Sequence, residues 1–252
     1  MTDERPLRLH CFAHAGAGVS AFYGWSPRLG AGVETVAHLL PGRERRRREA
    51  RLTRPADLLT DLLGRFTAQD RGVPYVLYGH SLGALVAYTL TRALHEAGLA
   101  GPSLLVVGAC PPPDAASDLS DACRARDEDL LHLLDEVGAL PRGAGPDGLW
   151  HRAVLPVLRD DLVLAHGLRA AAREPSPAGL LDVPVLAVAG ADDPLAPPRA
   201  MAQWKHWTSG RFTARTVPGD HFFVRGSELP RLVGRAARVV RRLTPDPARV
   251  SS

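Results

Sequence analysis

The sequence predicts an α/β fold with a mostly parallel sheet covered by helices on both faces. Short apolar runs alternate with longer segments of helical periodicity. Gly and Pro residues separate these segments, as expected at turns. The chain has 252 residues, 45% of them hydrophobic and 23% charged, which is the balance of an ordinary globular protein with one sizeable core.

The predicted strands are short apolar runs, most of them closed by turn residues. They cover residues 7–12, 33–40, 73–78, 103–109, 183–189 and 212–217. The predicted helices begin at Pro55, with an apolar face that reaches Phe66, and cover residues 82–97, 199–207 and 227–243.

One long segment breaks this alternation. Residues 114–177 contain no convincing strand but have helical patterns at 128–137, 149–158 and 160–172, with Gly and Pro gathered at 141–148. We expect a helical lid over the site, inserted into one discontinuous core domain of residues 1–113 and 178–243. The alternative is a set of packed helices with no gating role. Residues 244–252 are expected to form a disordered tail.

Composition limits the classes of function. The formal net charge is +4, without the clustered basic and aromatic residues typical of nucleic-acid binding, so we expect no nucleic-acid partner. No apolar run is long enough to cross a membrane, and no secretory segment is evident. Three cysteines, Cys11, Cys110 and Cys123, lack a disulfide or metal-ligand pattern, which favours the cytoplasm. We expect a monomer.

The pentapeptide Gly79-His80-Ser81-Leu82-Gly83 matches a G-x-S-x-G motif. An apolar strand precedes it and a helix follows it, which is the nucleophile elbow of the α/β-hydrolase fold. The two glycines suit a turn that is too tight for larger neighbours. We therefore expect Ser81 to be the nucleophile, the alternative being an idle serine in a Gly-containing turn.

A serine hydroxyl needs a histidine as base and a carboxylate that orients this histidine. In this fold the chain order is serine, acid, histidine, which excludes every histidine before Ser81. His221 follows the last predicted strand in a loop, whereas the other later histidines lie in helical patterns. We therefore expect His221 to be the base.

The acid is expected in the loop after the strand at 183–189, where Asp192 and Asp193 are both candidates. Asp193 lies three residues after the turn glycine Gly190, the usual position, so we predict Asp193 as the acid. Asp192 would then be a turn or capping residue, and Asp220, beside the histidine, a loop residue.

An oxyanion intermediate needs fixed hydrogen-bond donors. The backbone N–H of Leu82, at the start of the helix after the nucleophile, is one candidate. The backbone N–H of Ala15, in the Gly-rich loop after the first strand, is the other.

Several short motifs occur in a fixed order along most of the chain. They are Phe12-Ala13-His14-Ala15-Gly16, Leu40-Pro41-Gly42-Arg43, the serine pentapeptide, the Leu-Pro-Val-Leu-Arg-Asp-Asp run at 155–161, Asp193-Pro194 followed by Trp204 and Trp207-Thr208, and Gly219-Asp220-His221-Phe222-Phe223. This ordered set resembles the type II thioesterases that accompany modular polyketide synthases and non-ribosomal peptide synthetases. The chain departs from the family pattern at Ala13 (usually Pro), at Asp220 (usually Gly) and in the extra arginines Arg45 to Arg48.

The resemblance implies an editing hydrolase. Such enzymes remove stalled or wrong acyl groups from the phosphopantetheine arm of acyl or peptidyl carrier proteins, which would be transient partners. The resemblance implies no metal and no protein-bound cofactor, because phosphopantetheine belongs to the substrate. Two alternatives stay open: another serine hydrolase, such as an esterase or a cyclising thioesterase, and a catalytically inactive scaffold that binds partners.

The arginine-rich stretch at 43–51 has two interpretations. It is either a landing patch for an acidic carrier protein or for the pantetheine phosphate, or a solvated loop balanced by Glu44 and Glu49. Similarly, Trp150 either lines an acyl channel or packs between helices.

Overall fold

The computed structural model describes residues 6–69, 74–138, 140 and 148–243, and within them six strands form one sheet. All neighbouring strands are parallel, in the order β2-β1-β3-β4-β5-β6. The strands are β1 (Leu7–Phe12), β2 (Val33–His38), β3 (Tyr75–His80), β4 (Leu104–Gly108), β5 (Val185–Gly190) and β6 (Phe212–Val217). The predicted fold class is confirmed.

Several strand ends differ slightly from the prediction: β2 ends at His38 instead of residue 40, and β4 is one residue shorter at each end. Pairing and proline chemistry explain two further differences. β3 continues to His80, because this residue pairs with Gly108 of β4. β5 begins at Val185, two residues later than predicted, because Pro184 has no N–H to add to the ladder. The predicted start of the third strand, Val73, lies outside the described residues.

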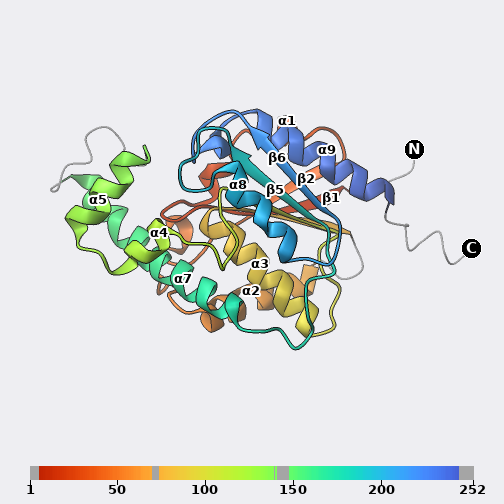
Figure 1. Cartoon of the computed structure of the whole chain (residues 1–252), viewed down its shortest axis with the longest axis horizontal. Coiled ribbons are helices and arrows are strands. Elements are labelled where there is room, and N and C mark those ends of the chain that lie inside the picture. The colour runs from red at the N-terminus through yellow and green to blue at the C-terminus, as the bar shows by residue number, and fades with distance from the viewer. Residues whose placement is uncertain (1–5, 70–73, 139, 141–147, 244–252) are drawn as a thin grey trace, which may run out of the picture.

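Helices cover both faces of the sheet (Figure 1). One face carries α2 (Pro55–Gln69), α3 (Leu82–Glu96) and α7 (Leu155–Arg173), and the other carries α1 (Ser26–Leu29) and α9 (Glu228–Leu243).

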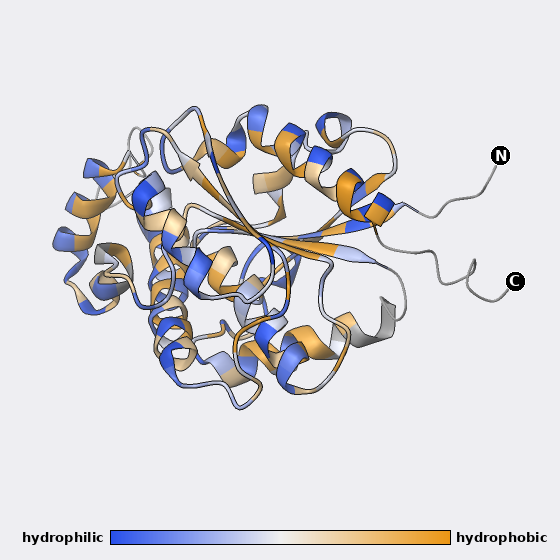
Figure 2. Cartoon of the chain, turned by 45° about the vertical axis from the view of Figure 1, so that its right-hand side comes forward, coloured by the Kyte–Doolittle hydropathy of each residue, from blue (hydrophilic) through white to orange (hydrophobic). Residues whose placement is uncertain are grey.

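The two cores follow from the alternation of side chains along each strand. Leu77 and Leu105 point into the core on the α3 side, whereas Val76 and Val106 point into the core on the α9 side. All four are fully buried. Apolar colour accordingly runs along the strands in the middle of the molecule, and blue residues gather on the outer sides of the helices (Figure 2).

The described secondary structure between β4 and β5 is mainly helical. The described residues of this segment contain α4 (Asp118–Asp121), α5 (Asp127–Glu136), α6 (Leu149–Ala153) and α7, and none of them forms a strand of the sheet. α4 and α5 extend beyond the sheet at the left of Figure 1. Together with α7 they enclose a separate small core that includes Leu130, Leu134, Leu158 and Leu162.

Three predicted helices are divided differently in the structure. The prediction broke the pattern at Arg159, but α6 ends at Ala153 and α7 runs without interruption from Leu155 to Arg173. Pro156 lies in the first turn of α7, where its missing N–H costs nothing, so the new helix begins there. The predicted helix at 199–207 is a short α8 (Pro198–Met201) followed by the 3₁₀ turn η4 (Ala202–His206).

Further short 3₁₀ turns connect the main elements. They are η1 (Val19–Phe22), η2 (Glu44–Arg46), η3 (Ala122–Arg124) and η5 (Phe223–Arg225). The predicted tail at 244–252 and most of the Gly- and Pro-rich stretch at 141–148 lie outside the described residues. Within the described ranges, no helix has the length and apolar character needed to span a membrane.

Because every strand is parallel, their carboxyl ends lie along one edge of the sheet. The loops that leave this edge include residues 13–18 after β1, the turn at Ser81 after β3, residues 191–197 after β5 and residues 218–222 after β6. Ligands of open α/β sheets bind at this edge.

Candidate active site

Ser81 lies in a sharp turn between β3 and α3. Its backbone has φ 54° and ψ −118°, a conformation that L-residues rarely adopt. The Ser81 N–H donates to the carbonyl of Gly108 at 2.8 Å, and its own carbonyl accepts from the Ala84 N–H at 2.9 Å. These bonds hold the strained backbone, so the side chain is presented at the end of the sheet.

The two glycines of the motif are required by close backbone contacts. A Cβ atom on Gly83 would overlap the carbonyl of Phe12 at the end of β1. A Cβ atom on Gly79 would overlap the carbonyl of Gly83 one helical turn ahead. The small residues that the sequence predicted beside Ser81 therefore allow β3 and α3 to meet at a tight angle.

The structure brings His221 and Asp193 together from the loops after β6 and β5. The Nδ1 atom of His221 lies 3.1 Å from Oδ1 and 3.0 Å from Oδ2 of Asp193. Both residues are buried, at 3% exposure. Because a carboxylate can only accept, the shared proton stays on Nδ1, and the opposite nitrogen, Nε2, is free to accept a proton.

Asp193 itself is fixed by backbone donors. Its Oδ1 accepts from the N–H of Leu195 at 2.9 Å and from the N–H of Ala196 at 3.1 Å. The neighbouring candidates differ: Asp192 is exposed, and Asp220 accepts from the Phe222 N–H at 2.8 Å within its own loop. Among the three aspartates, Asp193 is the one in contact with His221.

A buried histidine in the serine motif supports the His221 loop. His80 Nε2 donates to the carbonyl of His221 at 2.8 Å, and the hydroxyl of Tyr78 donates to His80 Nδ1 at 2.7 Å. Burial, followed by the proximity of His221, lowers the pKa of His80 well below its ordinary value. His80 is therefore neutral and ties the end of β3 to the loop that carries His221.

The amides of Ala15 and Leu82 have no hydrogen-bond partner within the described part of the chain. Both residues border the space beside Ser81. Leu82 opens α3, so its N–H is one of the unsatisfied donors at a helix N-terminus. The two amides are thus available to an acceptor next to the serine.

The loop after β1 is anchored by a buried ion pair. Asp161 of α7 accepts from the Gly16 N–H at 2.7 Å and from Arg43, Nη1 to Oδ2 at 2.7 Å and Nη2 to Oδ1 at 2.6 Å. Asp161 is 1% exposed and Arg43 8%. Arg43 also donates to the carbonyl of Ala17 at 3.0 Å. A helix of the β4–β5 segment is thereby bonded to the residue next to Ala15.

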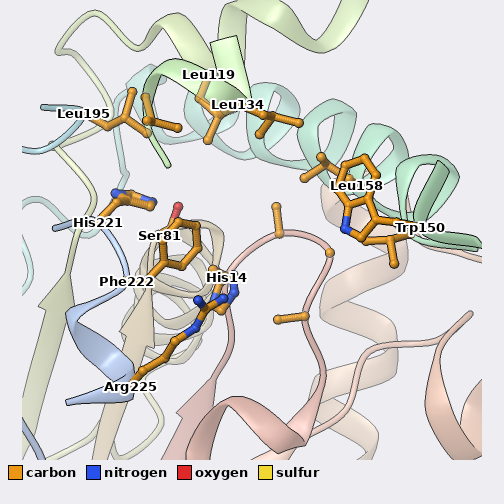
Figure 3. Close-up of a pocket in the computed structure, with 15 residues that line it drawn as sticks. His14, Ser81, Leu119, Leu134, Trp150, Leu158, Leu195, His221, Phe222 and Arg225 are labelled. Carbon is orange, nitrogen blue, oxygen red and sulfur yellow. The ribbon is translucent and has the colours of Figure 1, made fainter. Parts of the chain in front are cut away.

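Ser81 and His221 open into one cavity of about 230 Å³ (Figure 3). One wall is apolar and comes mostly from the β4–β5 segment, with Leu119, Leu134 and Leu158 labelled at the top and right of the view. The other wall carries His14, Phe222 and Arg225. Trp150 lines the apolar end of the cavity and also packs on the small core of the segment, so its role towards an acyl chain stays a prediction.

The nearby thiol does not compete with the serine. Cys110 borders the small space behind Ser81, but burial raises the pKa of its thiol to about 11, so it stays protonated. All three cysteines are free and buried. In the described residues, no three or more His, Cys, Asp or Glu side chains gather as metal ligands would.

Comparison with known proteins identifies the family. The family model described as a thioesterase domain matches residues 7–238. The chain belongs to the thioesterase family. Thioesterase PikA5 of Streptomyces venezuelae is 32% identical over 227 residues, which cover 86% of this chain and 75% of PikA5.

Solved structures agree. The RedJ thioesterase of the prodiginine biosynthetic pathway in Streptomyces coelicolor is 34% identical, with a TM-score of 0.78 over 92% of this chain and 90% of RedJ. YbtT, a type II thioesterase of the yersiniabactin pathway, is 26% identical, with a TM-score of 0.79 over 95% of this chain and 93% of YbtT. The resemblance inferred from the motifs is confirmed, and the protein is a thioester hydrolase.

In this thioesterase, His14 is neutral at physiological pH. Burial first, then the charges of His221 and Arg225, lower its pKa to about 3. The His14 ring lies 5.2 Å from that of Phe222 and 5.8 Å from that of His80. His14 therefore contributes a neutral wall to the pocket, a role that the chain-order argument could not detect.

The arginine-rich stretch is not a uniformly solvated loop. Arg43 is buried against Asp161, and Arg46 is buried against Asp61, with Nη2 2.7 Å from Oδ1. Arg51 pairs with Asp160 on α7. Within the stretch at 43–51, the exposed arginines that have no carboxylate partner among the described residues are Arg45, Arg47 and Arg48. Glu49, which was expected to balance this stretch, accepts from Arg46 at 2.8 Å.

Several residues of the thioesterase site escaped the sequence argument. Arg43 and Asp161 lie inside the quoted motifs, but their sequence separation of 118 hides the contact. His80 was set aside as a base because it precedes Ser81, and the chain-order argument did not show that it supports the His221 loop. Arg225 lies outside every motif quoted from the sequence, and only the fold places it in the pocket.

Proposed function

We propose that this thioesterase hydrolyses aberrant or stalled acyl groups from the phosphopantetheine arm of acyl or peptidyl carrier proteins, with Ser81, His221 and Asp193 as its catalytic residues. The contact of His221 with Asp193 beside the serine elbow is the observation that carries the proposal. The proposal includes a monomer in the cytoplasm, to which the buried free thiols are suited.

The first step is acylation of the serine. His221 Nε2 takes the proton of the Ser81 hydroxyl while Oγ attacks the thioester carbonyl carbon, and Asp193 stabilises the imidazolium through Nδ1–H. The carbonyl oxygen becomes an oxyanion, which accepts hydrogen bonds from the backbone amides of Ala15 and Leu82. The C–S bond then breaks, and His221 returns the proton to the leaving thiolate.

The second step releases the acid. His221 takes a proton from water, the hydroxide attacks the acyl–Ser81 ester at the same carbon, and the same two amides hold the second oxyanion. Collapse of this intermediate breaks the C–O bond to Ser81, and His221 returns the proton to Oγ. No resident metal or cofactor enters either step, because phosphopantetheine arrives with the substrate.

The helical segment at 114–177 is proposed as a lid over this site. It supplies most of the apolar side chains of the cavity wall, including Leu119, Leu134, Val154 and Leu158. These side chains suit an acyl chain and exclude bulk water from the ester. The contact of Asp161 with Gly16 and Arg43 would hold the lid base against the oxyanion loop while the outer helices move.

The carrier protein is proposed to dock near the exposed arginines Arg45, Arg47 and Arg48. Carrier domains of acidic surface would be attracted there, whereas the buried Arg43 and Arg46 serve the fold. Charge reversal at the three exposed positions should slow hydrolysis of carrier-bound substrate but not of a small thioester. An equal rate on both substrates would contradict docking at this stretch.

The catalytic assignment is tested with Ser81→Ala. Hydrolysis of a short acyl group on a purified carrier protein should fall by about 10⁴-fold or more. Wild-type enzyme quenched during turnover should carry an acyl mass on the peptide that contains Ser81, and the variant should not. Undiminished hydrolysis by the variant would refute the mechanism.

A parallel panel separates thioesterase from general esterase activity. The same acyl groups are offered as carrier thioesters, as small thioesters and as oxygen esters. The proposal expects the highest kcat/KM on the carrier-bound thioesters. A preference for oxygen esters would favour a carboxylesterase instead.

A further inference from the structure

The wall of the active-site cavity opposite the leucines carries one permanent cation. Arg225 lines the cavity together with Ser81 and His221 and ends η5, four residues after His221. In Figure 3 its side chain extends towards His14, on the far side of Ser81 from Leu119 and Leu134. An Arg at this place is a candidate substrate contact, because the residues around it are neutral or apolar.

Arg225 is an exposed residue whose guanidinium packs on an aromatic ring without being neutralised by it. Its Cζ atom lies 4.5 Å from the centroid of the Phe222 ring, a cation–π contact. The Phe222 ring also packs on His14, at 5.2 Å between centroids. No carboxylate pairs with Arg225 among the described residues, in contrast to Arg43, Arg46 and Arg51.

The described lining of the cavity contains no Asp or Glu. The nearest carboxylate of the site, Asp193, lies behind the imidazole of His221 and is engaged by it and by two backbone amides. His14 is neutral, since burial first, and then the electrostatic influence of His221 and Arg225, lower its pKa to about 3. The charge of Arg225 therefore has no internal counter-ion within the described wall.

We propose that Arg225 is a specificity-determining residue that binds an anionic oxygen group of the substrate, a carboxylate on the acyl chain or the phosphate of the pantetheine arm. Both groups present two oxygens to the planar fork of a guanidinium. The proposal rests on the function proposed above, since the anion must belong to a thioester whose carbonyl reaches Ser81.

The experiment uses two matched pairs of substrates. In the first pair, malonyl- and butyryl-N-acetylcysteamine, the malonyl group has a carboxylate where the butyryl group has its terminal ethyl group. The second pair, butyryl-4′-phosphopantetheine and butyryl-pantetheine, differs by the phosphate. The kcat/KM ratio of the anionic to the neutral member is measured for the wild type and for each variant.

The variants are Arg225→Gln, which removes the charge but keeps much of the side-chain length, and Arg225→Lys, which keeps the charge without the fork. Arg231→Gln is the control, because Arg231 is an exposed arginine at the start of α9 that pairs with Glu228 and does not line the cavity. Arg225→Gln should lower the ratio of one pair by about tenfold, and Arg225→Lys by less. The control should leave both ratios unchanged.

Each outcome has one meaning. A fall confined to the malonyl pair assigns the acyl carboxylate, and a fall confined to the phosphate pair assigns the pantetheine phosphate. Unchanged ratios, or an equal loss on all four substrates, overturn the inference even if Arg225→Gln is a slower enzyme. Failure of the proposed function is distinguishable, because wild-type enzyme would then hydrolyse none of the four thioesters.

Discussion

Replacing Asp161 with asparagine should destabilise the protein by about 3–5 kcal/mol, the cost of removing one partner of a buried ion pair. The carboxylate is 1% exposed and accepts three hydrogen bonds, from the Gly16 amide and from two guanidinium nitrogens of Arg43. Asparagine keeps one oxygen and turns an N–H₂ group towards these donors. The guanidinium of Arg43, 8% exposed, would then stay buried without a counter-charge.

The control lies one residue earlier. Asp160→Asn removes the partner of Arg51, but these side chains are 33% and 39% exposed, so the loss should be below about 1 kcal/mol. For a chain of this size, the Asp161 variant should melt about 6–20 °C lower than the wild type. Thermal unfolding of both variants, with urea unfolding to measure the free energy, tests the difference.

A double variant separates stability from catalysis. Arg43→Met with Asp161→Leu removes both charges, so much of the lost stability should return. In this double variant, however, the Gly16 amide has lost its hydrogen-bond acceptor on α7, so the neighbouring Ala15 N–H is no longer held in a fixed direction. We expect kcat to stay about 10²-fold below wild type, as for the loss of one oxyanion donor, with a smaller change in KM.

Two results would refute this reasoning. Equal stability of Asp161→Asn and Asp160→Asn would mean that the buried pair contributes no more than an exposed one. Full recovery of kcat in the double variant would mean that other contacts position the loop at Gly16.

Three further predictions concern the elbow, the pocket and pH. Gly83→Ala should destabilise the protein by about 1–3 kcal/mol, because the new Cβ would overlap the Phe12 carbonyl. The control Gly64→Ala, in a helix with open space around it, should be neutral or stabilising by about 0.5–1 kcal/mol. A small effect of Gly83→Ala in urea unfolding would contradict the close contact. Trp150→Ala should widen the apolar end of the cavity and raise the octanoyl-to-acetyl kcat/KM ratio, and an unchanged ratio would remove Trp150 from the acyl site. Because the pKa of His14 is lowered in the folded protein, the unfolded chain binds a proton on this imidazole at a higher pH than the folded chain does, and stability should fall as pH drops from about 6.5 towards 3. His14→Gln should flatten this dependence of stability on pH, measured by urea unfolding at several pH values. An unaltered dependence would oppose the assignment.

The sequence by itself determined the sheet, the elbow and the order of the loops. Strand periodicity and turn residues are local properties, so runs such as β1 and β6 were found at their observed bounds. Parallel strands bring their carboxyl ends to one edge, so Ser81, Asp193 and His221 could be expected to lie near each other before any contact was known. The choice between Asp192 and Asp193 was made from position in the loop, and the structure places Asp193 beside His221.

The tertiary structure alone decided which charges are paired and which face the pocket. Arg43 and Asp161 are 118 residues apart, and no pattern distinguishes this buried pair from the exposed pair of Arg51 and Asp160, because burial depends on how α7 packs over the loop after β1. Similarly, Arg225 is one of many arginines in the sequence, and only the turn at η5 directs it into the cavity. Local periodicity determines secondary structure, whereas the partner of a charge is set by packing between distant segments.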